Sequence, residues 1–307
     1  MYTAELQVAR TRPGSRPATR PLLLIANGNA SGTHKLEIAA MAVSALRSAG
    51  AHVEAHITTS IDELQAVWPD DPDRRVVLVG GDGTVHAVAN LRGPQPEIAL
   101  IPAGTANNIS RSVGIPRDLR AAAILATTGR VRPIDLIEAS VGERTHIVTE
   151  GVSVGFLAQA RVRYRGRNSG DVLRALRAGA GALSAFHPLR VRVTRDDERE
   201  DLQLAQLFVA NLPLYAFGLR VAPHADPEDE TLDFVGIEGA SRASIVAMLV
   251  ELHRGTAFEH LDVHVWRART ATISSHGVSP IVADSTDLGS GPVRLRSLPA
   301  ALRLVRP

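Results

Sequence analysis

The sequence predicts an α/β N-terminal domain with a doubly wound parallel sheet, followed by a β-rich, sandwich-like second domain. Over residues 21–137, short apolar runs alternate with helical patterns across short connections, which calls for a parallel sheet. Over residues 138–298, strand patterns follow one another with few helices between them. Residues 1–20 are expected to be a flexible lead-in, and residues 299–307 a tail that closes the second domain or returns to the first.

The elements of the first domain place four polar loops at one edge of the expected sheet. Apolar or alternating runs predict strands at residues 22–26, 53–57, 76–79 and 98–101. Helical patterns occupy residues 35–49, 61–67, 85–91, 109–113 and 119–127. The strands end in loops rich in Gly, Ser, Thr or Asn, at residues 27–32, 58–60, 80–84 and 104–108. Because ligands of such sheets bind at the carboxyl ends of the strands, the loops predict a nucleotide cleft.

The second domain is expected to consist mainly of strands. They are predicted at residues 146–159, 189–194, 202–211, 232–237, 263–265, 270–274 and 281–283. Two helices interrupt them, near residues 172–186 and 242–254. The apolar part of the second helix, residues 245–250, is interpreted as core rather than as a lipid-facing wall.

The sequence Gly80-Gly81-Asp82-Gly83-Thr84 lies where a buried valine-rich strand turns into a helix. Three glycines let the backbone turn sharply and come close to a ligand. Free N–H groups at a helix N-terminus suit a phosphate, and the Asp82 carboxylate beside it suits a divalent cation. The simpler interpretation is an ordinary Asp-Gly turn.

Composition excludes several classes of protein. The chain has no cysteine, which excludes disulfides and thiolate metal sites. Basic residues exceed acidic ones by two (34 minus 32) and aromatic residues are 4%, so nucleic acid is not an expected partner. No apolar run reaches the roughly 18–20 residues of a membrane span, and the N-terminus lacks a signal-peptide core. We therefore expect a cytoplasmic protein.

Together with Ile101-Pro102-Ala103-Gly104-Thr105-Ala106-Asn107, the glycine-rich sequence at residues 80–84 resembles the diacylglycerol kinase catalytic family. That family includes bacterial lipid kinases and sphingosine kinases, and NAD kinases share its core fold. The similarity continues over nearly the whole chain, at Asn27…Ser31-Gly32, Asp135, Ser153-Val154-Gly155-Phe156 and Ala222-Pro223-His224-Ala225.

The resemblance implies ATP-dependent phosphorylation of a lipid hydroxyl, with Mg²⁺, in a cleft between the two domains. The residues that it implies for nucleotide binding are Asn27, Thr58, Gly80, Gly81, Asp82, Gly83, Thr84, Val85, His86 and Thr105. The metal loop would use the Asp229 carboxylate and the carbonyls of Asp226 and Thr231. Asp284 and Asp82 are the implied catalytic residues, with Asp284 as the general base.

Four stretches of the sequence depart from the family pattern. Val85-His86-Ala87 stands where x-Asn-Glu is usual, and Asn108 where Asp is usual. The metal loop has Asp229-Glu230 instead of Asp-Gly, and Asp284-Ser285-Thr286 replaces Asp-Gly-Glu. Carboxylates are therefore missing at Ala87, Asn108 and Thr286, which weakens the retention of Mg²⁺.

Several residues keep two interpretations. For His86 the interpretations are phosphate binding, proton acceptance, or packing of its helix against the core. For Asp284 they are a general base or a residue that caps the turn at the end of a strand. The acidic stretch 226–230 is a metal loop or a solvated one. The arginines of the segment 161–167 dock on anionic lipid headgroups, grip a substrate phosphate or face solvent.

The function that the sequence predicts is an ATP-dependent lipid kinase acting on a diacylglycerol-like or sphingoid lipid. The alternative is a catalytically impaired protein that binds nucleotide or lipid on the same scaffold. NAD kinase ranks third, because His86-Ala87 stands where Asn-Glu would be expected. Peripheral contact with an anionic membrane and a homodimer are further expectations.

Overall fold

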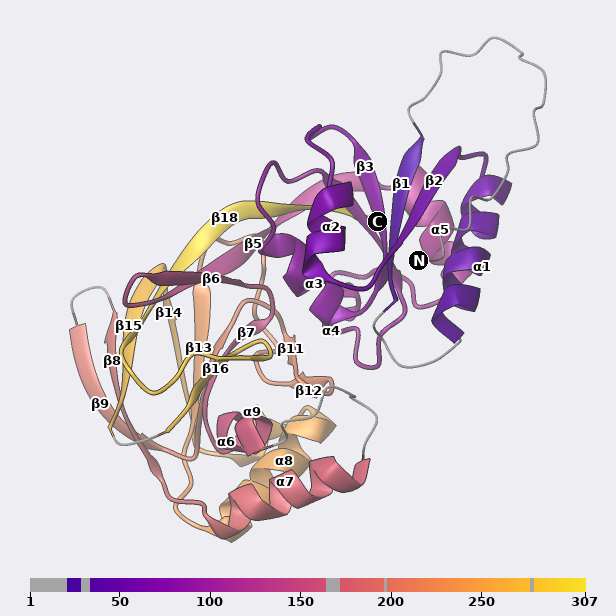
Figure 1. Ribbon diagram of the computed structural model, residues 1–307. Helices are drawn as coiled ribbons and strands as arrows, with labels where there is room; N and C mark the ends of the chain where they lie inside the picture. The colour runs from indigo at the N-terminus through magenta and orange to yellow at the C-terminus, as the bar shows by residue number, and fades with distance from the viewer. Residues whose placement is uncertain (1–20, 29–33, 164–171, 196–197, 277–278) are drawn as a thin grey trace, which may run out of the picture.

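The computed structural model describes residues 21–28, 34–163, 172–195, 198–276 and 279–307. The expected lead-in, the Ser31-Gly32 pair and residues 164–167 of the arginine segment lie outside the described residues. Figure 1 shows the two parts of the molecule, the first in indigo and violet and the second in pink, orange and yellow.

The first domain is a parallel sheet with helices on both faces, as the sequence predicted. Its elements are β1 Leu22–Asn27, α1 His34–Ser48, β2 Val53–Thr58, α2 Ile61–Val67, β3 Arg75–Gly80, α3 Asp82–Ala89, β4 Glu97–Pro102, α4 Asn108–Ser112 and α5 Leu119–Thr128. The strands pair in the order β2-β1-β3-β4, all parallel. Helices α2, α3 and α4 pack on one face and α1 and α5 on the other, because each carries an apolar stripe into one of two core clusters.

The second domain is a sandwich-like arrangement of strands with helices on its outer side. Its elements are β5 Arg130–Val141, β6 Arg144–Val148, β7 Gly151–Gly155, α6 Phe156–Arg163, α7 Val172–Ser184, β8 Leu189–Arg195, β9 Glu198–Leu204, β10 Gln206–Ala210, β11 Leu214–Tyr215, β12 Leu219–Arg220, β13 Leu232–Ile237, α8 Arg242–Arg254, α9 Ala257–His260, β14 Val263–Ala268, β15 Thr270–His276, β16 Ile281–Ala283, β17 Thr286–Asp287 and β18 Val293–Arg306. One sheet has the order β14-β13-β10-β7-β16-β17 and packs against strands β5, β8, β15 and β18 through a common core.

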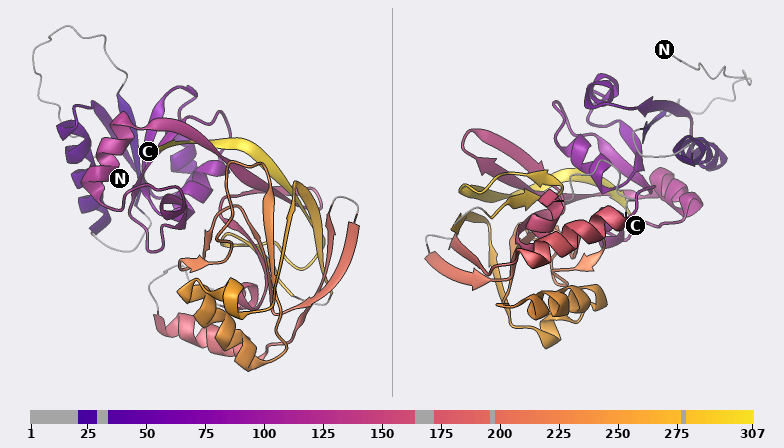
Figure 2. Two further views of the ribbon diagram at one scale, coloured as in Figure 1. Left: turned by 180° about the vertical axis from the view of Figure 1, so that it is seen from behind. Right: turned by 60° about the horizontal axis from the view of Figure 1, so that its bottom comes forward.

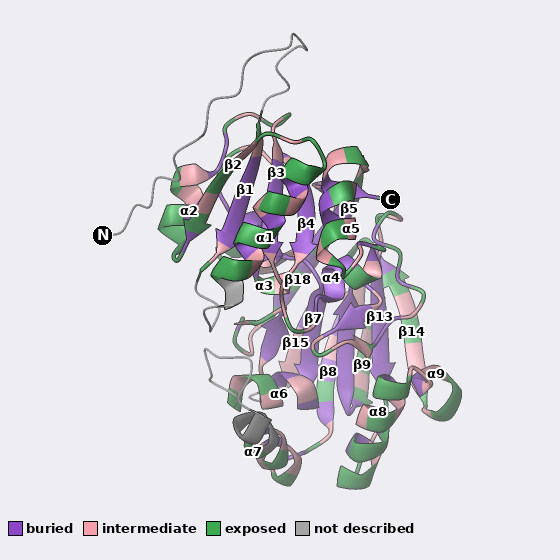
Figure 3. Ribbon diagram, turned by 90° about the vertical axis from the view of Figure 1, so that its right-hand side faces the viewer, coloured by how far each residue is buried: buried purple, intermediate pink, exposed green. Residues whose placement is uncertain are grey.

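Two expected strands are divided in the structure. The run 146–159 becomes β6, β7 and helix α6. The chain bends at residues 149–150 between two different sheets, and it turns from strand to helix at Gly155, whose φ of +115° favours glycine. The run 202–211 ends one strand at Leu204 and begins another at Gln206, in the other sheet. In helix α8, Ile245 and Met248 are buried whereas Val246 is 49% exposed, so only one face of the segment is core. In Figure 3, α8 and α9 at the lower end of the molecule are largely green and pink, whereas the strands above them are largely purple and thus buried.

Strands β5 and β18 join the two domains. They pair antiparallel from Arg130 with Arg306 to Ser140 with Arg294, with an irregularity between Leu298 and Leu302. One end of β18 pairs with β15, and its other end pairs with β4 of the parallel sheet at Leu304. The expected boundaries at 137/138 and 298/299 therefore fall inside continuous strands, and the chain ends in the first domain, as the left view in Figure 2 shows.

Leu302 tests whether the end of β18 completes the core of the first domain. Its side chain is fully buried there. Leu302→Ala is expected to lower the free energy of unfolding by about 2–5 kcal/mol, because it removes apolar contacts and leaves a cavity. Leu36→Ala, at a leucine 55% exposed on α1, is the matched control and is expected to change it by no more than about 0.5 kcal/mol. Urea unfolding of both variants measures the difference, and equal losses would contradict the assignment.

Candidate nucleotide site and interdomain acid cluster

Two glycine-rich loops touch at the carboxyl ends of β3 and β4. A Cβ atom on Gly81 would lie 2.8 Å from the Cα of Gly104, so neither position has room for a side chain. Asn107 holds the second loop closed, because its Oδ1 accepts the Gly104 N–H at 2.9 Å and its Nδ2 donates to the Gly104 carbonyl at 2.8 Å. Asn107 itself has a φ of +51°, a conformation that asparagine tolerates.

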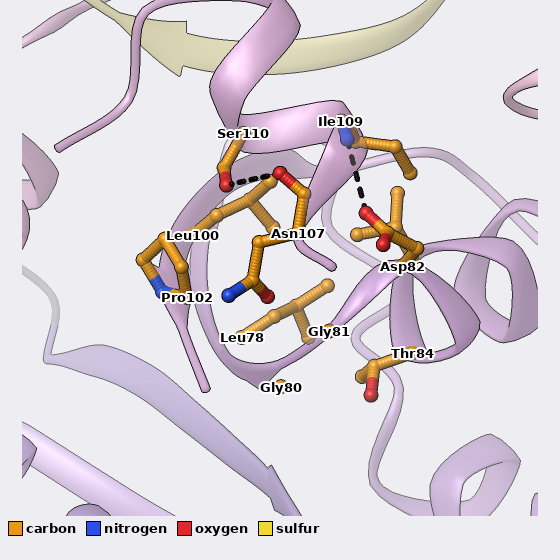
Figure 4. Close-up of a pocket in the computed structure, with 11 residues that line it drawn as sticks. Leu78, Gly80, Gly81, Asp82, Thr84, Leu100, Pro102, Asn107, Ile109 and Ser110 are labelled. Atoms are coloured by element: carbon orange, nitrogen blue, oxygen red, sulfur yellow. Dashed lines mark hydrogen bonds between the residues drawn. The ribbon is translucent and has the colours of Figure 1, made fainter. Parts of the chain in front are cut away.

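A small pocket opens between these loops. Its volume is about 10 Å³, so it is no larger than a water molecule, and its lining combines the buried apolar Leu78, Leu100 and Ile109 with Asp82, Thr84 and Asn107, as Figure 4 shows. No side chain caps the N-terminus of α3 at Gly81. A Cβ atom on Gly83, in the first turn of this helix, would meet nothing within 4 Å. The helix end therefore presents backbone and open space, which fits an anionic group.

The predicted nucleotide-binding residues gather along this sheet edge. Asn27 and Thr58 pair at the ends of β1 and β2, and Asn27 Nδ2 lies 3.4 Å from the hydroxyl of the buried Thr84. Thr105 is exposed on the second loop. Val85 differs from the others, because its side chain is buried in the core of the first domain and leaves only its backbone for a ligand.

Asp82 lies at the start of α3 and also contacts α4. Its Oδ1 accepts the Ile109 N–H at 3.0 Å, as Figure 4 shows. Burial raises the pKa of Asp82 above its ordinary value; the Ile109 hydrogen bond opposes this rise, and the negative charge of Asp284 adds to it. A cation bound to the Asp82 carboxylate would neutralise part of the negative charge of Asp82 and Asp284.

Asp284 follows β16 in the second domain, and its carboxylate accepts hydrogen bonds from both domains. Its φ of +48° lies in the left-handed region, which Asp and Asn tolerate better than most residues other than glycine. Five donors contact its two oxygens: His86 Nδ1, the Thr149 N–H and the Thr149 hydroxyl at 2.8 Å on Oδ2, and the Glu150 and Gly151 N–H groups at 2.8 and 3.1 Å on Oδ1. His86 belongs to α3, so the carboxylate links the glycine-rich turn to the second domain.

Asp284 and His86 shift each other toward their charged forms. Burial alone would raise the pKa of Asp284, but the His86 hydrogen bond and charge and the backbone N–H groups bring it below its ordinary value. Burial alone would lower the pKa of His86, but the hydrogen bond and negative charge of Asp284 raise it above its ordinary value of 6.5. The pair therefore behaves as an ion pair or a strong charge-assisted hydrogen bond.

The family models cover both domains of the chain. The model described as the diacylglycerol kinase catalytic domain matches residues 21–139. The model described as the YegS C-terminal NAD kinase beta sandwich-like domain matches residues 150–306, about half of the chain. The chain belongs to the diacylglycerol kinase family of lipid kinases.

Individual relatives agree with this membership. A protein of Mycobacterium tuberculosis named diacylglycerol kinase is 30% identical over 240 residues, covering 76% of each chain. The solved structure of a diacylglycerol kinase from Bacillus anthracis superposes with a TM-score of 0.68 at 19% identity, covering 95% of this chain and 98% of the other. The structure of an NAD kinase from Archaeoglobus fulgidus in complex with ATP has a TM-score of 0.50 at 16% identity, covering 92% and 93% of the two chains. These two structures share the fold with this chain.

In this member of the diacylglycerol kinase family, the metal loop implied by the sequence is already occupied by protein groups. Asp229 Oδ1 accepts both the N–H and the hydroxyl of Thr231, at 2.9 and 2.7 Å. Arg267 lies 3.7 Å from Asp229 Oδ2 and donates to Asp233 at 2.9 Å. Asp226 caps its own turn by accepting the Glu228 N–H at 3.0 Å. A guanidinium at this distance competes with a divalent cation for the Asp229 carboxylate.

The described residues contain no group of three or more acidic or histidine side chains arranged to hold a metal ion. A Mg²⁺ ion beside Asp82 would therefore need phosphate oxygens in addition to protein ligands, which is the usual manner of binding for this ion.

Among the described residues, no helix is long and apolar enough to cross a membrane.

Glu150 is a site residue that the sequence analysis missed. It lies between β6 and β7 and is buried, and its Oε2 accepts a 2.7 Å hydrogen bond from Asn108 Nδ2. Asn108 Nδ2 also donates to the Ala216 carbonyl. Burial raises the pKa of Glu150 well above its ordinary value, and the charges of Asp284 and Asp82 add to the rise. In the sequence, Glu150 is the single acidic residue of the run 146–159. Asn108, which it contacts in the structure, stands where the family has a carboxylate.

Glu150 has a predictable effect on the pH dependence of stability. A carboxyl whose pKa is raised in the folded protein keeps its proton while the unfolded chain has already lost it, so stability falls as pH rises above the ordinary value of 4.5. Glu150→Gln removes this loss and retains an acceptor for Asn108. The variant is expected to gain stability over the wild type as pH rises from about 5 to about 8.

Unfolding of the wild type, Glu150→Gln and Glu143→Gln at several pH values measures this effect. Glu143 is exposed and serves as the control. A gain for Glu150→Gln that does not change with pH would contradict the buried, protonated carboxyl.

Proposed function

We propose that this protein is an ATP-dependent lipid kinase, which transfers the γ-phosphoryl group of ATP to a hydroxyl of a diacylglycerol-like or sphingoid lipid. The observation that carries the proposal is the close contact of the Gly81 and Gly104 loops beside the uncapped start of α3. Membership of the diacylglycerol kinase family supports it. The NAD kinase from Archaeoglobus fulgidus, which shares the fold, was solved in complex with ATP, and this is consistent with ATP as the phosphoryl donor here.

Different residues of the site would position the phosphates and neutralise the charge on the transferred phosphoryl group. The backbone of residues 80–84 and the N-terminus of α3 would bind phosphate oxygens. Asp82 would hold Mg²⁺ together with those oxygens, and the ion would neutralise charge on the transferred group. Because Arg267 contacts Asp229, we do not assign the ion to Asp226, Asp229 and Thr231.

An apolar acceptor is supported by the hairpin next to the site. Phe217, at the tip between β11 and β12, is 68% exposed. The preceding residue, Ala216, accepts the hydrogen bond from Asn108, so this hairpin lies directly beside the acid cluster. An exposed aromatic ring beside a polar site suits a substrate with an apolar body and a hydroxyl head.

Membrane contact and self-association stay predictions. Arg161 and Arg163, at the end of α6, are the described part of the arginine segment expected to meet an anionic membrane. The homodimer and the cytoplasmic location expected from the sequence also stay predictions.

The second candidate is a protein that binds nucleotide or lipid without phosphoryl transfer. The observation that favours it is the absence of carboxylates at Ala87, Asn108 and Thr286. Incubation with γ-labelled ATP, Mg²⁺ and a mixed lipid extract separates the two candidates. Label in the lipid phase supports the kinase and identifies its acceptor, whereas nucleotide binding without label in any lipid supports the second candidate.

Gly83 tests whether phosphate approaches the start of α3. Gly83→Ala is expected to weaken ATP binding by about tenfold or more, because the added methyl group enters the space beside the helix end. The same change is expected to stabilise the fold by about 0.5–1 kcal/mol, since alanine favours a helix over glycine. Calorimetric ATP titration and thermal unfolding measure the two effects.

Gly179→Ala is the matched control, because Gly179 also lies in a helix, α7, with nothing within 4 Å of an added Cβ atom. It is expected to stabilise the fold similarly and to leave ATP binding unchanged. Unchanged ATP binding by Gly83→Ala would place the phosphates elsewhere.

A further inference from the structure

The hydrogen bonds around the His86–Asp284 pair occupy the acceptor positions of Asp284 and leave one acceptor position on His86. An ionised carboxylate offers about four lone-pair positions, and Asp284 already receives five donors. Its side chain is only 5% exposed. A lipid hydroxyl would have to displace one of these donors to reach it. Asp284 is therefore poorly placed to accept a proton from a substrate.

His86 has the free acceptor that Asp284 lacks. Asp284 is ionised and accepts only, so the 2.8 Å hydrogen bond fixes the ring proton on Nδ1 and leaves Nε2 as an acceptor in the neutral imidazole. The side chain is 21% exposed. Nε2 receives no hydrogen bond from the described residues, and it is not among their buried polar atoms that lack a partner. The nitrogen therefore opens to solvent.

His86 also lies on the correct side of its helix. It follows Asp82 by four residues, so the two side chains share one face of α3, one turn apart. The pocket between the glycine-rich loops includes Asp82. A substrate hydroxyl that approaches phosphates bound beside Asp82 would therefore meet the face of α3 that carries His86, one turn further along the helix.

We propose that His86 Nε2 accepts the proton of the lipid hydroxyl and that Asp284 positions the imidazole and stabilises the imidazolium that forms. This inference rests on the proposed lipid kinase function. As the substrate oxygen forms its bond to the γ-phosphorus of ATP, its proton passes to Nε2. The bond from the γ-phosphorus to the bridging oxygen breaks, and ADP leaves with that electron pair. Asp284 is then a positioning residue, in place of the general-base role that the resemblance implied.

The charged groups near His86 come from several elements. Asp284, which follows β16, contacts it, Asp82 lies on its own helix, and Glu150 precedes β7. Strand β6, which packs on α3, carries Arg144 and His146. Of these groups only Asp284 contributes charge to the shift in the pKa of His86. Glu150 is itself a titratable carboxyl with a raised pKa, so its contribution to a pH profile is measured with its own variant.

The experiment compares the pH dependence of kcat/KM for lipid phosphorylation in the wild type, His86→Gln, Glu150→Gln and His253→Gln. A base must be unprotonated, so wild-type activity is expected to fall as pH drops below the pKa of His86, which lies above 6.5. His86→Gln is expected to lower kcat by about 10²–10⁴-fold and to remove this acidic limb while ATP affinity is unchanged. His253, exposed on α8, is the matched control.

The possible results separate this inference from the proposed function. An acidic limb that Glu150→Gln retains and His86→Gln loses supports His86 as the proton acceptor. A limb and a kcat retained by His86→Gln overturn the inference and leave the kinase intact. A large loss of ATP affinity in His86→Gln also overturns it, because His86 would then bind phosphate. Absence of transfer to any lipid by the wild type overturns the proposed function, and this inference with it.

Discussion

The carboxylate of Asp284 is the interaction on which the arrangement of the site depends. It gathers three consecutive N–H groups, from Thr149 to Gly151, and the imidazole of His86 on the opposite domain. These donors compensate the cost of burying an ionised group, which is large when no partner is present. The surrounding hydrogen bonds also fix the left-handed backbone conformation at Asp284. Helix α3, which begins at the glycine-rich turn, is thereby linked to the residues that follow β16 and to the start of β7.

A second polar contact follows from the same geometry. Asn108 donates to Glu150 and to the Ala216 carbonyl, and so links α4 to the second domain. Three carboxyl groups, on Asp82, Glu150 and Asp284, then interact electrostatically in a buried region. Burial with this repulsion raises the pKa of Asp82 and Glu150, whereas His86 and the backbone keep Asp284 charged. Groups with separated pKa values are the usual basis for dividing acid, base and cation-binding roles within one site.

The departures from the family pattern have local structural counterparts. Asn108 stands where the family has Asp, but a carboxyl group still lies at this place in the structure, because Glu150 accepts a hydrogen bond from the asparagine side chain. In the acidic loop, Glu230 adopts a φ of +63° where the family has glycine, and Arg267 supplies positive charge beside Asp229. Charge compensation in this chain therefore comes from side chains that lie far away in sequence.

The sequence by itself determined the alternation of strands and helices in the first domain, because buried strands and amphipathic helices have distinct apolar periods. It also determined the glycine-rich turns at residues 80–84 and 104–108, because close backbone contact excludes every larger side chain. The tertiary structure alone decided that β5 and β18 run through both domains, since pairing between residues 130 and 306 leaves no local pattern. It also decided the partners of Asp284 and Glu150. Their hydrogen bonds join residues separated by 42 to 198 positions, and only packing of the two domains brings such groups together.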